Sequence, residues 1–382
     1  MDLSIPEEVE IMRQEVSRFV DEELAPHEKE VEEREEIPAE LRASLRKKAA
    51  ELGLLSLGVP EECGGAGLDI LAQAILWETF GKVSLPLVLG ILPEGYELLA
   101  HGTKAQQDAY LAPCLSGDAT SCVAVTETTA GAEEDEVALT ARRDGDHFIL
   151  DGKKIFVANG DVADFAVVLA RSDEAAGPRH GLSCFVVDRG SPGCLVGERR
   201  RTLGLHGVNF VELTFDACRV SAEHVIGEVG AGFALMRSWR DEARLKLSAW
   251  CVGMGERLLD GAKEYAKQRY TFGKPIAERQ AIQWMLAESA TDLRATRMMA
   301  YHAAWKKSLG EEAHKEVAMV KVFATEMFHR LTDRALQIHG GLGYTKDLHY
   351  ERYYRDARML RVLWGGSESL RSDISESILA GA

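Results

Sequence analysis

QIHGGLGYTKDLHYERYYRDARMLRVLWGGSESLR, residues Gln337–Arg371, is the stretch from which the fold of this chain is best inferred. Its first residues end an apolar helix, which Gly340-Gly341 then breaks. Because glycine has no Cβ, the backbone can approach a ligand closely there. An arginine-rich segment with acidic residues at helical spacings follows, and Trp364–Ser367 breaks the chain again before a last helix. Two glycine breaks around such a helix indicate a phosphate or nucleotide site. The alternative is two helix ends joined by a salt-bridged surface helix.

The segments QIHGGLGY, ERYYRDAR and GGSESLR closely resemble the C-terminal signature of the acyl-CoA dehydrogenase family, and the resemblance covers nearly the whole chain. It implies an α+β multi-domain fold with an N-terminal helical domain (residues 1–118), a small β-domain (119–227) and a C-terminal four-helix bundle (228–382). The comparison with the family's signature also shows one position at which this chain differs. Many members carry the catalytic glutamate immediately before the glycine of the last loop, where this chain has Gly365.

Residue patterns support the same three-part division. Apolar positions recur at helical spacing in the first part, as in Ile70–Phe80, and again in long runs after residue 232 that we expect to end near Gln268, Leu309 and His339. Between them lie short runs rich in β-branched and aromatic residues. Dipeptides such as Asp151-Gly152 predict turns between these strands.

Composition narrows the functional classes. The chain has 382 residues and a net charge of −16, which argues against nucleic-acid binding because no basic face offsets it. No apolar run reaches the ~18 residues that a membrane span needs. The 7 cysteines are scattered, the N-terminus lacks a signal-peptide pattern, and no metal constellation is visible, so we expect a cytoplasmic protein with reduced thiols.

Three further segments carry the resemblance to the family's FAD site. VTETTAGAEED (Val125–Asp135), GKKIFVANG (Gly152–Gly160) and RYTFGKPIAERQAIQ (Arg269–Gln283) resemble its flavin and pyrophosphate motifs. In the family, the arginine and phenylalanine of the third motif reach the cofactor of a neighbouring subunit, which implies a homotetramer. A guanidinium suits a pyrophosphate because its fork donates to two oxygens. The implied cofactor-binding residues are Thr126, Phe156, Ala158, Arg269, Phe272, Gln280, Gln337, Gly340, Gly341 and Ser367.

Catalytic and substrate residues are implied by the segment Gly232–Trp250, which resembles the helix that holds the CoA pantetheine. Asp241 and Arg244 match the family's aspartate and arginine. Some members place the catalytic glutamate just before this arginine, where the chain has Ala243. Glu242 is the nearest carboxylate, but adjacent helical residues point about 100° apart. Glu242 therefore reaches the site only if the helix bulges, or if the register of the match, fixed on Arg244 and Gly253, slips by one residue. Gly365 keeps the backbone N–H that polarises the thioester in the family.

Three hypotheses follow from these residues. The first is an FAD-dependent acyl-CoA oxidoreductase with a displaced base, passing electrons to an electron-transfer flavoprotein or another carrier. The second is a member that runs other chemistry on a CoA thioester, such as the desulfinases, which also lack the glutamate. The third is an inactive partner subunit of a mixed oligomer. Glu94 and Tyr96 either line the acyl pocket or begin a helix.

Overall fold

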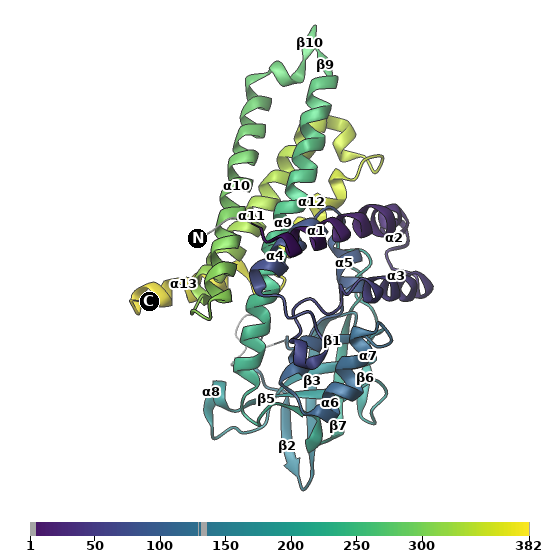
Figure 1. Ribbon diagram of the computed structural model, residues 1–382, viewed down its shortest axis with the longest axis vertical. Helices are drawn as coiled ribbons and strands as arrows, with labels where there is room; N and C mark the ends of the chain where they lie inside the picture. The colour runs from purple at the N-terminus through teal and green to yellow at the C-terminus, as the bar shows by residue number, and fades with distance from the viewer. Residues whose placement is uncertain (1–4, 129, 131–135, 382) are drawn as a thin grey trace.

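A computed structural model describes residues 5–128, 130 and 136–381 of the protein. In Figure 1 the β-sheet lies at the lower end, the long helices rise above it, and the first helices pack at the junction. This is the predicted α+β architecture of a helical domain, a β-domain and a helical bundle. The predicted domain boundaries at residues 118 and 227 stay predictions.

The N-terminal part is helical. Asp69 begins its central helix, α4, since the Asp69 side chain accepts a hydrogen bond from the N–H of Ala72 at 2.8 Å. This helix is buried nearly all round because it packs against α1 and α9. The helices are α1 (Glu7–Phe19), α2 (Glu28–Arg34), α3 (Ala39–Glu51), α4 (Ile70–Phe80), α5 (Leu85–Ile91), α6 (Lys104–Gln106) and α7 (Ala112–Leu115), with short π- and 3₁₀-helical turns between them.

The middle part is an 8-stranded sheet with the order β6-β7-β3-β2-β4-β5-β8, in which β1 pairs with β4 in parallel. Apolar side chains pack on both of its faces. The strands are β1 (Ser121–Ala124), β2 (Thr140–Asp144), β3 (His147–Ala158), β4 (Phe165–Arg171), β5 (Leu182–Asp188), β6 (Cys194–Val196), β7 (Phe210–Ser221) and β8 (Val225–Ile226), and α8 (Gly177–His180) connects β4 to β5.

The predicted turn at Asp151-Gly152 is wrong, because β3 runs straight through it. The pairing of β3 with β7 shifts register between Leu150 and Gly152, which marks a bulge. Gly152 sits there at φ +141°, and the Asp151 side chain accepts a hydrogen bond from the N–H of Ala217 at 2.7 Å. The strand therefore continues to Ala158, and Phe156 near its end is half-exposed.

Long antiparallel helices form the upper end. The predicted helix ends at Gln268 and His339 are confirmed, and the end predicted at Leu309 differs by one residue. The indole N–H of Trp250 donates to the carbonyl of Val83 at 3.0 Å, which ties the bundle to the first domain. The elements are α9 (Gly232–Gln268), the hairpin strands β9 (Tyr270–Thr271) and β10 (Lys274–Pro275), α10 (Gln280–Ser308), α11 (His314–His339), η9 (Gly340–Tyr344), α12 (Tyr350–Leu360) and α13 (Ser367–Leu379).

Two arginines of α12, Arg352 and Arg355, are engaged within the protein. Arg352 lies 3.4 Å from Glu28, and Arg355 lies 2.8 Å from Glu351 and 2.5 Å from Glu32. Pairs at i and i+4 stabilise the helix, and the longer-range pairs fasten it to the N-terminal domain. The salt-bridged helix that the sequence offered as the alternative to a phosphate site is therefore the structure found for these arginines.

Across the described residues, no helix combines the length and apolar character that a bilayer crossing requires. Within the same ranges, no group of three or more His, Cys, Asp or Glu side chains is arranged to hold a metal ion.

Candidate functional site

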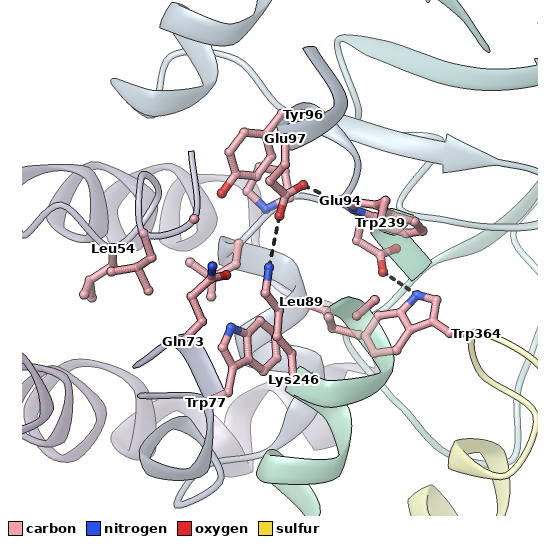
Figure 2. Close-up of a pocket in the computed structure, with 15 residues that line it drawn as sticks. Leu54, Gln73, Trp77, Leu89, Glu94, Tyr96, Glu97, Trp239, Lys246 and Trp364 are labelled. Atoms are coloured by element: carbon pink, nitrogen blue, oxygen red, sulfur yellow. Dashed lines mark hydrogen bonds and ion pairs between the residues drawn. The ribbon is translucent and has the colours of Figure 1, made fainter. Parts of the chain in front are cut away.

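A small cavity of about 40 Å³ lies where the N-terminal helices meet α9 and the loop before α13. Figure 2 shows polar and aromatic side chains converging on it from these segments. By volume it has room for about three water-sized groups. The lining residues used below are Gln73, Glu94, Glu97, Trp239, Ala243 and Trp364.

Glu94 and Glu97 reach the cavity from the tight turn that follows α5. Gly95 between them adopts φ +85°, and a Cβ there would lie 2.4 Å from the side chain of Val123, so only glycine fits. The turn leads directly into the 3₁₀ helix Tyr96–His101, where the hydroxyl of Tyr96 donates to the carbonyl of Leu55 at 2.7 Å. This anchor fixes both carboxylates against α9.

The Glu94 carboxyl has one hydrogen bond from a described residue. The indole N–H of Trp364 donates to its Oε1 at 2.9 Å (Figure 2). Burial raises the pKa of Glu94 to about 7; the Trp364 hydrogen bond opposes the rise and the nearby Glu97 adds to it. A pKa in this range is typical of carboxyls at functional sites.

Glu97 is satisfied by contrast. Lys246 Nζ lies 3.5 Å from its Oε1, and the indole N–H of Trp239 donates to its Oε2 at 3.3 Å. Figure 2 shows this ion pair as one polar wall of the cavity. Among the described residues, Lys246 therefore neutralises Glu97, whereas Glu94 receives a hydrogen bond from the indole of Trp364 and has no cationic partner.

Ala243 and Gly365, the family's two base positions, differ in their surroundings. Ala243 lines the cavity. Gly365 has φ +113°, and a Cβ there would lie 2.8 Å from Nη2 of Arg244. The Arg244 guanidinium is held by the carbonyl of Trp364 at 2.8 Å and by Asp241 at 3.0 Å. A side chain at position 365 would be strained and crowded, whereas position 243 opens onto the cavity.

Glu242 does not reach the cavity. The base role predicted for it requires a bulge, but α9 is a regular α-helix throughout Gly232–Gln268. The Glu242 carboxylate instead lies 3.9 Å from Nζ of Lys307 on α10. Since successive helical residues point about 100° apart, Ala243 faces the cavity and Glu242 turns away from it.

Gly365 keeps its backbone N–H, but that group is engaged. It donates to the carbonyl of Val362 at 3.2 Å, closing a turn. Polarising a thioester oxygen through this N–H would require exchanging this long turn bond for one to the substrate.

Asp241 and Arg244, the predicted substrate-binding residues, form an ion pair within α9. Both are buried, and His314 Nδ1 lies 2.9 Å from Asp241 Oδ2. A wider cavity of about 270 Å³ begins beside Asp241 and is lined by Arg237, Lys307 and other residues at this end of the bundle. This cavity borders Asp241, the partner of the buried Arg244.

One part of the predicted cofactor set lies on and beside β3. Phe156 is half-exposed on this strand and borders a cavity of about 230 Å³ that Val362 also lines. Ala158 ends the same strand, and the N–H of Ile155 donates to the carbonyl of Thr126 at 2.8 Å. Ser367 begins α13, and its hydroxyl is fully buried without a hydrogen-bond partner among the described residues. An exposed aromatic face beside a cavity fits a planar ring system, and the unpaired hydroxyl is a further hydrogen-bonding group in the predicted set.

Part of the motif Val125–Asp135 lies outside the described residues, namely 129 and 131–135.

The rest of the cofactor set lies at the opposite end of the bundle, where α9 and α11 end and α10 begins (Figure 1). From Asp241 to Arg269 along α9 the rise is about 42 Å. Phe272 is 98% exposed at the tip of the β9–β10 hairpin. Within one chain the structure therefore does not unite the predicted set, which consists here of Arg269, Phe272, Gln280, Gln337, Gly340 and Gly341.

The sequence did not identify four of the residues that line this cavity, namely Glu97, Lys246, Trp239 and Trp364. Glu94 was predicted only as a lining residue or a helix start, and the structure places it in the cavity lining. The available signal was the PEGYE segment, in which a glycine separates two acidic residues just after an apolar helix.

Comparison with known proteins agrees with this architecture. Residues 6–118, 122–218 and 230–379 match the acyl-CoA dehydrogenase N-terminal, middle and C-terminal domains. The chain is 35% identical to the 3-(aryl)acrylate reductase of Clostridium sporogenes, covering 98% of this chain and 99% of that protein. It is also 35% identical to the bovine (Bos taurus) mitochondrial short-chain specific acyl-CoA dehydrogenase, covering 99% and 91%.

A solved structure described as PigA with FAD and proline superposes on the whole of both chains, with a TM-score of 0.94 and 28% identity. The sequence matches span all three parts of the fold. The chain belongs to the acyl-CoA dehydrogenase family, whose members are FAD-dependent oxidoreductases.

Proposed function

We propose that this protein is an FAD-dependent oxidoreductase that acts on the α,β-bond of a short acyl-CoA thioester, in the oxidising or the reducing direction. The observation that carries the proposal is the 40 Å³ cavity, which is lined by Ala243 and Trp364 and adjoins the buried Arg244. The relatives include both a dehydrogenase and a reductase, which supports either direction.

The chain's own residues would position the thioester and exclude water from the cavity. When bound, FAD supplies the hydride acceptor or donor. Arg244 fixes the loop before α13 through the Trp364 carbonyl, and the indoles of Trp239 and Trp364 wall the acyl end. Exclusion of water would strengthen the electrostatic interactions between these residues and the thioester. Phe156 and Ser367 would hold the flavin ring, and Asp241 with Arg244 would hold the thioester arm.

A second candidate is a reaction on a CoA thioester that does not begin with proton removal by the family's glutamate. Ala243 and the crowded Gly365 favour it, because neither family position holds a carboxylate. A desulfinase-like enzyme fits this description, and so does an inactive subunit of a mixed oligomer. Copurification of a second, related chain from the native host would support the inactive subunit.

We further propose that the protein assembles as a homotetramer in the cytoplasm, with Arg269, Phe272 and Gln280 contacting the cofactor of a neighbouring subunit. The exposure of Phe272 and the ~42 Å rise from Asp241 to Arg269 support contacts between subunits. An electron-transfer flavoprotein or another carrier would exchange electrons with the bound flavin. Light scattering on the purified protein tests the assembly, and a monomer with full FAD content would contradict it.

Anaerobic flavin spectroscopy tests the proposed reaction. Purified protein loaded with FAD is mixed with short acyl-CoA thioesters, and dithionite-reduced protein is mixed with the matching enoyl-CoA thioesters. Bleaching in the first case or reoxidation in the second supports the oxidoreductase. A protein that binds FAD and thioesters but shows neither change contradicts it and favours the second candidate.

A further inference from the structure

Glu94 is a polar group of the 40 Å³ cavity, called the acyl cavity below, that the protein leaves incompletely satisfied. Its Oε1 accepts from the indole of Trp364 at 2.9 Å, and its Oε2 receives no hydrogen bond from a described residue. The Glu94 side chain lines the cavity and keeps partial exposure, so Oε2 is open to a group that enters. A carboxyl oxygen that a ligand removes from water needs a hydrogen-bond partner, which a donor on that ligand supplies.

Among the other polar side chains around the cavity, Lys246 and Gln73 already have partners, and the indole N–H of Trp77 donates to no described residue. Lys246 lies 3.5 Å from Glu97, and the amide nitrogen of Gln73 donates to the carbonyl of Leu68 at 2.8 Å. The Lys246 cation is thus balanced by Glu97 rather than by Glu94. A group that enters the cavity therefore meets a carboxyl oxygen that accepts hydrogen bonds, beside a polar wall with no net charge.

An alkyl end would match this environment poorly, because it would cover the Glu94 oxygen without donating to it. A donor group would satisfy that oxygen and favour the ionised carboxylate, which burial otherwise disfavours. The small volume also places the end of the acyl group within a few atoms of the thioester. Both considerations select a short acyl group that ends in a hydrogen-bond donor.

We infer that Glu94 determines substrate specificity by accepting a hydrogen bond from an ammonium or hydroxyl group at the end of a short acyl chain. The inference rests on the proposed function, since it concerns the acyl thioester of that same site. Trp364 is a positioning residue for Glu94, because its indole fixes the carboxyl plane. The bulk of Trp77, Trp239 and Trp364, which all line the cavity, excludes longer and branched chains.

Three CoA thioesters that match in heavy-atom count test the inference: butyryl-CoA, 3-hydroxypropionyl-CoA and β-alanyl-CoA. They differ only in a terminal methyl, hydroxyl or ammonium group. Dissociation constants are measured on the FAD-loaded protein by calorimetry, so the readout does not depend on turnover. We expect at least one donor-bearing thioester to bind about tenfold or more tightly than butyryl-CoA.

Two variants assign the effect to Glu94. Glu94→Leu should remove the preference for donor-bearing thioesters. Glu94→Gln keeps an acceptor oxygen but no charge, so it should retain a preference for the hydroxyl and lose one for the ammonium. FAD content and melting temperature of both variants are compared with the parent, and a Glu94→Leu variant that loses either is replaced by Glu94→Met.

Each outcome decides a different point. Equal binding of the three thioesters, or a preference that persists in Glu94→Leu, overturns the inference and leaves the proposed function intact. No binding of any of the three contradicts the proposed function and the inference together. Selective binding of β-alanyl-CoA identifies an ammonium as the recognised group, and selective binding of 3-hydroxypropionyl-CoA identifies a hydroxyl.

Discussion

The acyl cavity and the hairpin end of the bundle are built in different ways. At the hairpin end, Arg269, Phe272 and Gln280 follow one another along a short exposed segment. In the cavity, Glu94, Ala243 and Trp364 come from three separate parts of the chain and meet only in the folded protein. A contiguous motif shows its function in the sequence itself, whereas an assembled cavity shows its chemistry only after folding. The family resemblance is accordingly complete at the hairpin and broken in the cavity.

The largest expected effect comes from returning a carboxylate to the cavity. Ala243→Glu places one on its wall, and we expect flavin reduction by butyryl-CoA to accelerate about 10²-fold or more, as general bases typically do. Stopped-flow absorbance under anaerobic conditions measures the rate. Ala243→Asp, with a shorter side chain, covers the case in which glutamate overfills the cavity.

Gly365→Glu is the matched control for this gain. We expect no acceleration and a lower melting temperature, because the new side chain meets Arg244 and strains a backbone at φ +113°. A faster reaction in Gly365→Glu than in Ala243→Glu would reverse the proposed difference between the two positions.

The pH dependence of stability probes Glu94 directly. Burial first, and then Glu97, raises the pKa of Glu94 to about 7, so between about pH 4.5 and 7 the folded protein holds a proton that the unfolded chain has lost. This group therefore lowers stability as pH rises through that window. Relative to the parent, Glu94→Gln should gain about 2–3 kcal/mol at pH 8 and little at pH 4.5.

Urea unfolding of the parent and the variant at both pH values measures this difference. The exposed Glu62→Gln serves as the control and should follow the parent. A gain in Glu94→Gln that is equal at pH 4.5 and pH 8 would show that the carboxyl is not held in its protonated form.

At the hairpin end we expect a smaller effect on cofactor retention. Arg269→Ala removes a proposed charge-assisted partner of the pyrophosphate, which should weaken FAD binding about tenfold. Fluorescence of FAD released on dilution measures the affinity. Lys267→Ala changes a neighbouring exposed cation at the same helix end, paired with Glu264 at 2.8 Å, and should retain FAD like the parent.

The smallest expected effect concerns Glu242. Because its carboxylate faces Lys307 at 3.9 Å rather than the cavity, Glu242→Gln should change the rate of flavin reduction by less than about twofold. Abolished reduction in this variant, with FAD and ligand binding intact, would return Glu242 to the mechanism and require α9 to rearrange when the thioester binds.

Sequence reasoning succeeded where a local pattern determines the outcome. The helix start at Gln280 and the helix end at Gln268 followed from apolar periodicity that stops at a turn-rich segment. It failed at Asp151-Gly152, where a dipeptide typical of turns sits in a β-bulge that pairing with β7 maintains. Turn propensity is local, and a long partner strand overrides it.

The candidate site was predictable in the same uneven way. The residues matching the family motifs were identifiable one by one, and the 100° rule already indicated that Glu242 points away from the side that Ala243 faces. The partners of Glu94 were not identifiable, because Trp364 and Glu97 acquire their roles from tertiary packing. Nor does a linear pattern show that Glu97 is neutralised by Lys246 while Glu94 is not.

The contact between Arg244 and Gly365 also constrains the mutational paths open to this protein. A glutamate fits at position 365 only when the flexible end of the Arg244 side chain turns aside and the backbone gives up its positive φ. That shift would loosen the contacts of Arg244 with the Trp364 carbonyl and with Asp241. Position 243 imposes no such rearrangement. A descendant that regained the family's carboxylate would therefore gain it with less disturbance on α9 than in the last loop.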